Sequence, residues 1–448
     1  MRGLLTIAAL VAAIGARGGT ARADDPKVAF EKYTLPNGLE VILVPDQSVP
    51  IVAVEVWYHV GSGNETHGKS GFAHLFEHMM FQGSKNTGAD AHFKILQKAG
   101  ATNINGTTNF DRTNYFEVVP SNQLETALWL ESDRMGHLLD VLGKDQLANQ
   151  IDVVRNERRQ REDNRPYGKS DFAMYEALYP EGHPYRYEVI GRHEDLETAS
   201  VDDVKSFFRT WYVPANATLA ISGDFDPAAA KKLVDKWFAS FPKSEKPKLV
   251  AIPPPQVAAK EITVADPFAK LPQVKFAWHS PANFAPGDAE LDFVADALAR
   301  EGTGRLYKAL VYDRPLAESV RANQGGRTFS GIFEITVTLR SHADVNEVKK
   351  IVMDELAKVT HDRLDPKEMA RVVAQMEAWV VYGLQSVLGR AEVTEMCNHW
   401  HGNPDCITWN LDRYRKATPE QVQLTASRYL VPEHMITIVT TPVKGGAK

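Results

Sequence analysis

Cysteine is scarce in this chain of 448 residues, which contains only two. Two cysteines form at most one disulfide, so a small scaffold held together by several disulfides is excluded. Positive charge is not in excess either, because 51 basic and 57 acidic side chains give a formal net charge of -6. Without a basic stripe beyond one short arginine-rich helix, this balance argues against a nucleic-acid or anionic-membrane partner.

Long hydrophobic runs are absent as well, and none reaches the roughly 18 apolar residues needed to cross a membrane. One shorter run, residues 4–15, follows Arg2 and precedes the small-residue triplet Ala21-Arg22-Ala23. This order is typical of a secretory signal peptide, so we predict that residues 1–23 are removed and that the mature protein is exported to a bacterial periplasm. The alternative is a short membrane anchor.

Proline is concentrated in residues 244–260, which predicts a linker between an N-terminal domain, residues 24–243, and a C-terminal domain, residues 261–448. The ends of these domains resemble each other at a constant spacing of 218 residues, as in Val204 with Val422 and Pro214 with Pro432. Each end reads as an amphipathic helix, a proline-marked turn and a β-branched strand. We interpret this as an internal duplication; the alternative is chance likeness between two common segments.

Strand and helix patterns come in runs rather than in strict alternation. Asn37-Gly38 lies between apolar residues and predicts a hairpin, and residues 51–58 predict a further strand. Helical periodicity follows over residues 71–80, 121–140 and 145–161. We therefore predict an α+β fold of two homologous sandwich domains, each with an antiparallel-rich sheet packed against helices.

The most informative motif is His74-x-x-Glu77-His78. Residues 74 and 78 are one helical turn apart, so two imidazoles can converge on a single cation. Glu77 lies on the same face, where its carboxylate can accept a proton from a water molecule that the metal activates. The alternative is that these three residues form the solvent face of an amphipathic helix.

A catalytic zinc ion needs a third protein ligand, and the helix predicted over residues 145–161 offers one. Leu147, Ile151 and Val154 mark its buried stripe, and Glu157 continues that inward side. Most of the neighbouring arginines point outward on this pattern. The alternative is an exposed glutamate in surface ion pairs.

Together with the segment Leu-Pro-Asn-Gly-Leu at residues 35–39, these motifs resemble the pitrilysin/insulinase family of inverted zincins, over essentially the whole mature chain. The chain is most similar to short bacterial members, which resemble the subunits of mitochondrial processing peptidase. The resemblance implies that His74, His78 and Glu157 hold one zinc ion and that Glu77 is the general base of a metalloendopeptidase. It also implies two similar domains that form half of a clamshell around a peptide substrate.

Residues 100–108 resemble the strand of this family to which the substrate backbone adds. The resemblance implies substrate-binding roles for four residues of this strand and the next, namely Asn103, Asn105, Thr107 and Tyr115. The alternative is an ordinary edge strand protected by polar residues. The family usually has Asn-Ala where this chain has Asn105-Gly106. Gln150 stands where many relatives have a glutamate that supports the metal site, so the hydrogen-bonding group is kept and the charge is lost.

The larger departure lies in the second half. Active relatives carry an arginine and a tyrosine that reach the substrate carbonyl, whereas this chain has Val311 and Glu318 at those positions. We therefore expect a homologous partner subunit that supplies the Arg/Tyr pair, or a homodimer. The alternative is a non-catalytic structural or assembly subunit of the same fold.

The two cysteines, Cys397 and Cys406, are close in sequence. After export they can form a disulfide that closes a short loop. Free thiols are one alternative, and a second metal site with His399 and His401 is another.

Overall fold

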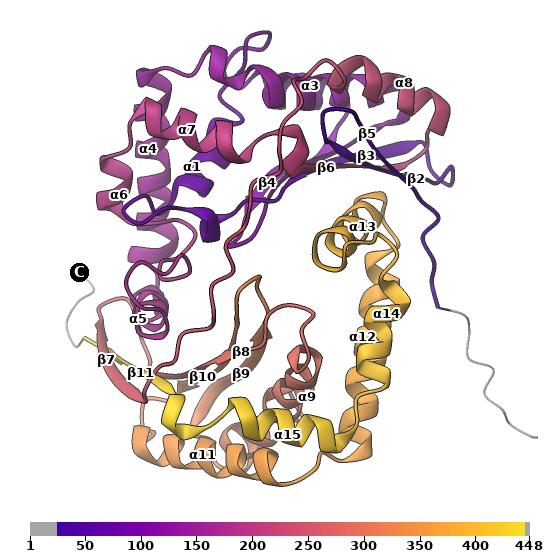
Figure 1. Ribbon diagram of the computed structural model, residues 1–448. Helices are drawn as coiled ribbons and strands as arrows, with labels where there is room; N and C mark the ends of the chain where they lie inside the picture. The colour runs from indigo at the N-terminus through magenta and orange to yellow at the C-terminus, as the bar shows by residue number, and fades with distance from the viewer. Residues whose placement is uncertain (1–24, 444–448) are drawn as a thin grey trace, which may run out of the picture.

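The computed structural model describes residues 25–443. The predicted signal peptide, residues 1–23, lies outside the described residues. Within the described part of the chain, no helix is both long enough and apolar enough to cross a membrane. The fold consists of two sheets, each with helices against it, one above the other in Figure 1.

The first sheet has the strand order β1-β2-β6-β3-β5-β4. Its strands are β1 (Glu31–Thr34), β2 (Glu40–Pro45), β3 (Ile51–Tyr58), β4 (Thr102–Thr108), β5 (Thr113–Pro120) and β6 (Ala217–Gly223). β2 and β6 are parallel, and the other neighbours are antiparallel. The predicted hairpin at Asn37-Gly38 joins β1 to β2, with Gly38 in the left-handed region at φ 99°.

The second sheet has the order β7-β11-β8-β10-β9. Its strands are β7 (Lys260–Asp266), β8 (Gln273–Ser280), β9 (Ala317–Gly325), β10 (Gly331–Leu339) and β11 (Ile436–Pro442). In the first sheet, the last strand in sequence, β6, lies between β2 and β3; in the second sheet, the last strand, β11, lies between β7 and β8. The pairings of β6 with β2 and of β11 with β7 are parallel, and those with β3 and β8 are antiparallel. The equivalent order confirms two homologous domains.

The helices of the first half are α1 (Phe72–Met79), α2 (Ala91–Lys98), α3 (Leu124–His137), α4 (Lys144–Arg158), α5 (Gly168–Leu178), α6 (His193–Glu197), α7 (Val201–Trp211) and α8 (Pro227–Phe238). Those of the second are α9 (Asp288–Ala299), α10 (Arg305–Tyr307), α11 (Val345–His361), α12 (Pro366–Gly383), α13 (Val387–His401), α14 (Ile407–Arg415) and α15 (Pro419–Tyr429). The duplicated ends are α7 with β6 and α15 with β11. Val204 and Val422 are fully buried at matching places in the two cores.

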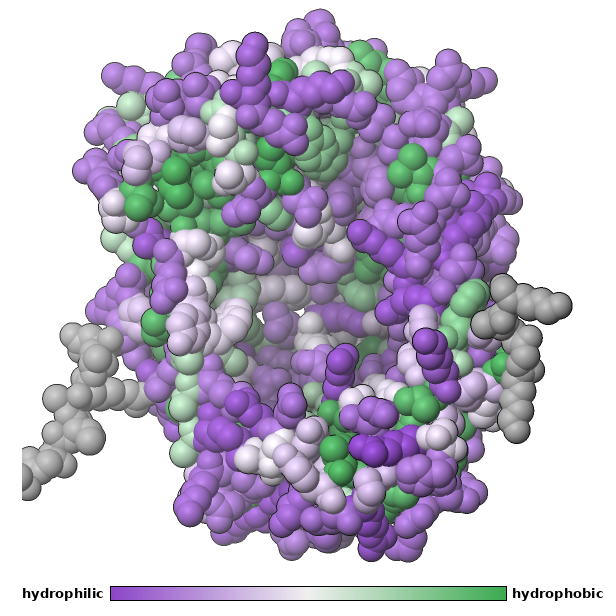
Figure 2. Space-filling model, turned by 180° about the vertical axis from the view of Figure 1, so that it is seen from behind, coloured by the Kyte–Doolittle hydropathy of each residue, from purple (hydrophilic) through white to green (hydrophobic). Residues whose placement is uncertain are grey.

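Each half gives one helix to the other half. α13 packs against the open face of the first sheet, where Val387 contacts Ala53 and Val118. α5 packs against the second sheet, where its residues join the core around Ile436 and Ile438. Residues 242–259, which contain most of the predicted linker, have no helix or strand and run from one half to the other (Figure 1). Seen from behind, the molecule is hollowed between its two halves (Figure 2).

Candidate metal centre

Helix α1 carries the His-x-x-Glu-His motif with its apolar side in the core. Phe72, Leu75, Phe76 and Met79 are all buried, so the polar stripe of the helix faces a cleft. The helix begins after Gly71, whose φ of 88° and close approach to the carbonyl oxygen of Ile190 leave no room for a side chain. The start of α1, and with it the direction of the motif, is therefore fixed by the backbone.

Glu65 caps this helix, which the sequence did not predict. Its two carboxylate oxygens accept hydrogen bonds from the backbone N–H groups of Gly71, at 3.0 Å, and Ala73, at 2.7 Å. These side-chain oxygens satisfy donors at the helix N-terminus that otherwise lack partners. Burial nevertheless raises the pKa of Glu65 to about 8, because the hydrogen bonds from the helix offset only part of the cost of burying a charge. The only sequence signal was a glutamate shortly before a helix.

The three predicted ligands converge from α1 and α4. Oε2 of Glu157 lies 3.2 Å from Nε2 of His78 and 3.9 Å from Nε2 of His74. The ligand atoms of the three residues all lie within 4.8 Å of one another. Ligands bound to one tetrahedral zinc at about 2 Å are roughly 3.3 Å apart, so the donor set and its spacing fit this ion.

The protonation states also suit a cation. Burial, and then the neighbouring His78, lower the pKa of His74 to about 4, so this imidazole is neutral at pH 7 as a ligand must be. The pKa of Glu157 is lowered, and the largest cause is the hydrogen bond between Glu157 and His78. The other oxygen of Glu157 pairs with Arg161 at 2.6 Å, which orients the carboxylate.

Glu77 borders the same cleft as the three ligands. Burial raises its pKa, and a hydrogen bond from Thr108 opposes this rise. Thr108 Oγ1 donates to Glu77 Oε2 at 2.6 Å. A carboxylate with a raised pKa beside a metal site is suited to accept and return a proton. Thr108 was not predicted, because its proximity depends on strand β4 lying against α1.

Gln150 is buried and lines the cleft from α4, the helix that also carries Glu157. Asn105 and Thr107 line the cleft from strand β4, which is the edge strand of the first sheet. Asn103 is exposed, with φ 51°, where the pairing of β4 with β5 shifts register. The structure therefore places Gln150, Asn105 and Thr107 in the lining of the cleft that holds the ligands and leaves Asn103 at the irregular start of the strand.

The prediction for Tyr115 is wrong. Its side chain is fully buried under the sheet, where its ring contacts Tyr58 and Phe81 and lies beneath the guanidinium of Arg134. The strand alternation that brings Thr113 and Glu117 inward does the same to Tyr115. A peptide added to the edge of β4 cannot touch it.

Within the part of the chain that the structure describes, no Arg/Tyr pair lines the cleft. Among the described residues that line it there is one arginine, Arg161, and no tyrosine. Arg305 and Tyr312 are seven residues apart, the same separation as positions 311 and 318. However, Arg305 forms a bidentate ion pair with Glu368, and Tyr312 is exposed on a π-helical turn over residues 308–313. Their spacing is therefore unrelated to the metal centre.

Cys397 and Cys406 are joined by a disulfide. The nearby histidines turn to other partners: the ring of His399 stacks on His59, and the ring of His401 stacks on Trp409. The structure thus forms the predicted disulfide rather than a second metal site there.

A second cluster with metal-ligand residue types, His92, Glu117 and Glu131, is fully buried behind the cleft. Both carboxylate oxygens of Glu131 are occupied by the guanidinium of Arg134. Burial, and then the neighbouring Glu131, raise the pKa of Glu117 well above its usual range, which favours the neutral form of this side chain. The guanidinium of Arg134 already pairs the acidic charge of Glu131, and we assign no cation to this cluster.

Two family profiles match successive parts of the chain. Residues 40–175 match the profile described as "Insulinase (Peptidase family M16)", and residues 198–376 match the "Peptidase M16 inactive domain". The chain belongs to this family, which is also called the pitrilysin family. The first match contains all the predicted ligands and the second contains none.

Known proteins resemble this chain over most of its length. The zinc protease PqqE of Helicobacter pylori is 29% identical over 361 residues, which is 80% of this chain and 80% of that protein. A crystal structure of a protease from Helicobacter pylori matches with a TM-score of 0.85 at 26% identity, covering 93% of this chain and 100% of that one. The periplasmic protease PqqL of Escherichia coli matches with a TM-score of 0.77 at 16% identity, covering 94% of this chain but 49% of PqqL.

Proposed function

We propose that this protein is a zinc-dependent endopeptidase that hydrolyses peptides or unfolded segments and binds one zinc ion per chain. The observation that carries the proposal is the convergence of His74, His78 and Glu157 beside Glu77 in an open cleft. Similarity to PqqE, which is named a zinc protease, supports the metal and the reaction class.

Glu77 is the general base in this proposal. Zinc in such sites acts as a Lewis acid that polarises a peptide carbonyl and lowers the pKa of water. Glu77 takes the proton of the attacking water and passes it to the leaving amine, and the hydrogen bond from Thr108 fixes which carboxylate oxygen faces the cleft. Arg161 pairs with Oε1 of Glu157, while Oε2 faces the two histidines.

The substrate binds as an added strand. β4 pairs only with β5 in the described sheet, so its outer edge carries free backbone donors and acceptors next to the metal ligands. Main-chain pairing tolerates many side-chain sequences, which suits unfolded segments. Asn105 and Thr107 give this edge its side-chain contacts with substrate.

A homologous partner subunit, or a second copy of this chain, completes the chamber. The absence of a tyrosine from the described cleft lining supports a donor from another chain. PqqL, of which this fold matches about half, shows that a relative of the fold can be twice as long. The signal-like leader and the likeness to a periplasmic protease support export to the periplasm.

Metal analysis and peptide cleavage by wild type and Glu77→Gln test the proposal. The purified chain is assayed alone and with the products of neighbouring genes, and Glu301→Gln, on an exposed residue of the second half, is the matched control. We expect one zinc in all three proteins and a loss of cleavage, about 100-fold or more, in Glu77→Gln only.

Two outcomes contradict parts of the proposal. Zinc binding without cleavage in any combination of chains favours the alternative, a structural or assembly subunit, and the missing Arg/Tyr pair is the observation behind that alternative. Full activity from a rigorously pure homomer, with no added chain, removes the heteromeric partner while leaving the peptidase in place.

A further inference from the structure

The loop between β9 and β10, residues 326–330, leaves the second sheet and inserts into the first half of the molecule. It begins at Gly326, where a Cβ atom would lie 2.6 Å from Cα and 2.9 Å from the backbone N of Asn283. Such contacts exclude any larger residue, so the path of the loop is set by this close approach.

Arg327 of this loop is held in an aromatic box of the first half. Its Cζ lies 3.8 Å from the ring centroid of Phe110 and 5.1 Å from that of Tyr175. Its Nη2 donates a hydrogen bond to the Tyr175 hydroxyl at 2.6 Å. A desolvated guanidinium against aromatic faces is bound more strongly than an exposed one, so this contact is a firm link between the two halves.

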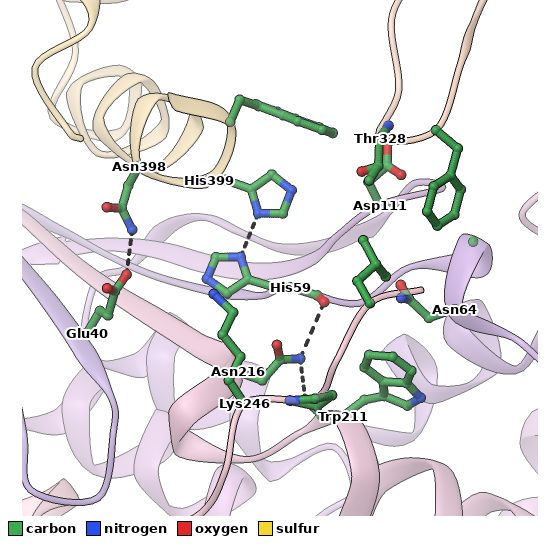
Figure 3. Close-up of a pocket in the computed structure, with 15 residues that line it drawn as sticks. Glu40, His59, Asn64, Asp111, Trp211, Asn216, Lys246, Thr328, Asn398 and His399 are labelled. Carbon is green, nitrogen blue, oxygen red and sulfur yellow. Dashed lines mark hydrogen bonds between the residues drawn. The ribbon is translucent and has the colours of Figure 1, made fainter. Parts of the chain in front are cut away.

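The next residues of the loop hold Asp111, the neighbour of Phe110. The backbone N–H of Thr328 donates to Asp111 at 3.2 Å, and the two residues face each other in Figure 3. The Tyr185 hydroxyl donates to the other carboxylate oxygen of Asp111 and accepts from the N–H of Phe329 at 3.3 Å. The loop therefore contacts both Phe110 and Asp111, which lie next to each other in the turn between β4 and β5.

That turn joins β4 to β5 and carries Thr108 against the general base. Thr108 is the last residue of β4, two positions before Phe110, and its hydroxyl bonds Glu77. β4 is an edge strand, and its pairing with β5 is irregular between Thr102 and Asn105. The far end of β4 is thus weakly fixed by the sheet, whereas the end at Thr108 is held both by regular pairing with β5 and by the turn.

We propose that Arg327 is a positioning residue for hydrolysis: the C-terminal half, through Arg327 and its loop, holds the β4–β5 turn so that Thr108 keeps Glu77 in its working orientation. This inference rests on the proposed function. A base that is misplaced by a fraction of an ångström slows the chemical step more than it weakens substrate binding.

Steady-state kinetics on a quenched fluorescent peptide test this role, with the full chain and whatever partner its activity requires. The variants are Arg327→Met, Thr108→Val and the double variant. Arg321→Met, on an exposed arginine of β9, is the matched control. We expect Arg327→Met to keep its zinc and to lose about tenfold in kcat with KM within about twofold.

The double variant decides the route. If Arg327 acts through Thr108, the double variant loses no more in kcat than Thr108→Val alone. Losses that multiply independently overturn the proposal, as does a kcat of Arg327→Met equal to that of Arg321→Met. If Arg327→Met does not fold, Tyr175→Phe removes only the hydroxyl that accepts its hydrogen bond. We then expect a kcat lower by about threefold, and an unchanged kcat overturns the proposal.

Failure of the parent function gives a different result. If Glu77→Gln cleaves as fast as wild type, the proposed peptidase mechanism is wrong. If Glu77→Gln is inactive while Arg327→Met and Arg321→Met have the same kcat, only the positioning role of Arg327 is wrong.

Discussion

The contact of His59 with His399 predicts that acid weakens the docking of α13 on the first sheet. Their Nδ1 atoms are 2.6 Å apart across the interface, and their rings stack with centroids 4.8 Å apart (Figure 3). One Nδ1 must donate and the other accept, so the pair is bonded only while one of them is unprotonated. Burial, and then the charges of Lys246 and Arg112, lower the pKa of His399 to about 4.

The magnitude follows from that shift. The pKa of His399 falls from 6.5 to about 4, and one unit corresponds to about 1.4 kcal/mol. Because the folded pKa is the lower one, the unfolded chain binds more protons in this range, so stability is full above pH 6.5 and is lost as the pH falls toward 4. Between pH 7 and pH 4.5 the loss from His399 alone is roughly 2 kcal/mol.

Urea unfolding at a series of pH values, for wild type and His399→Gln, measures this loss. Glu55, also at this interface, has a pKa that burial raises to about 7, so its titration acts in the opposite direction over the same range. The difference between the two proteins cancels that contribution, since both keep Glu55. We expect wild type to lose about 2 kcal/mol more than His399→Gln on acidification.

The exposed His342 provides the control, because His342→Gln should follow wild type at every pH. Equal pH dependence of wild type and His399→Gln would refute the reasoning, since it would mean that His399 has the same proton affinity in the folded and the unfolded chain.

Three further predictions concern single contacts. Replacing Cys397 and Cys406 by serine removes a crosslink between residues nine apart in sequence. The free energy of unfolding, measured with urea, should fall by about 2 to 3 kcal/mol. No change would show that the disulfide does not restrict the unfolded chain. Glu65→Ala removes the cap of α1 and should cost about 1 to 2 kcal/mol and weaken zinc binding in a competition titration, whereas unchanged zinc affinity would contradict its role. Gly106→Ala places a Cβ 3.0 Å from the Tyr115 ring and 3.2 Å from the side chain of Glu77. This contact should displace Glu77, so kcat should fall while zinc is retained. An unaltered kcat would show that the base tolerates the contact.

The sequence predicted the parts of the site that local geometry fixes. His74 and His78 share a helical face by periodicity alone, and Glu157 continued an apolar stripe that the structure shows as buried Leu147 and Val154. The repeat at 218 residues was readable because helix, turn and strand recur in the same order. Asn37-Gly38 specified its hairpin through backbone chemistry alone.

Contacts between distant segments could not be read in this way. Thr108 bonds Glu77 only because β4 lies beside α1, and Tyr115 was misplaced because strand alternation, not resemblance, decides which face a residue occupies. The exchange of α5 and α13 between the halves had no local signal. Both helices carry apolar residues that would suit any neighbouring sheet.

The exchange of α5 and α13 has a consequence for how the polypeptide is made. The first sheet is complete in sequence by Gly223, yet the helix that covers its open face ends at His401. Until nearly the whole chain has been synthesised, apolar residues such as Ala53 and Val118 have no cover and are exposed to aggregation. Maturation of the metal-binding half therefore waits for the C-terminal half. Expressed alone, the metal-binding half should need a chaperone or a solubilising partner to remain monomeric.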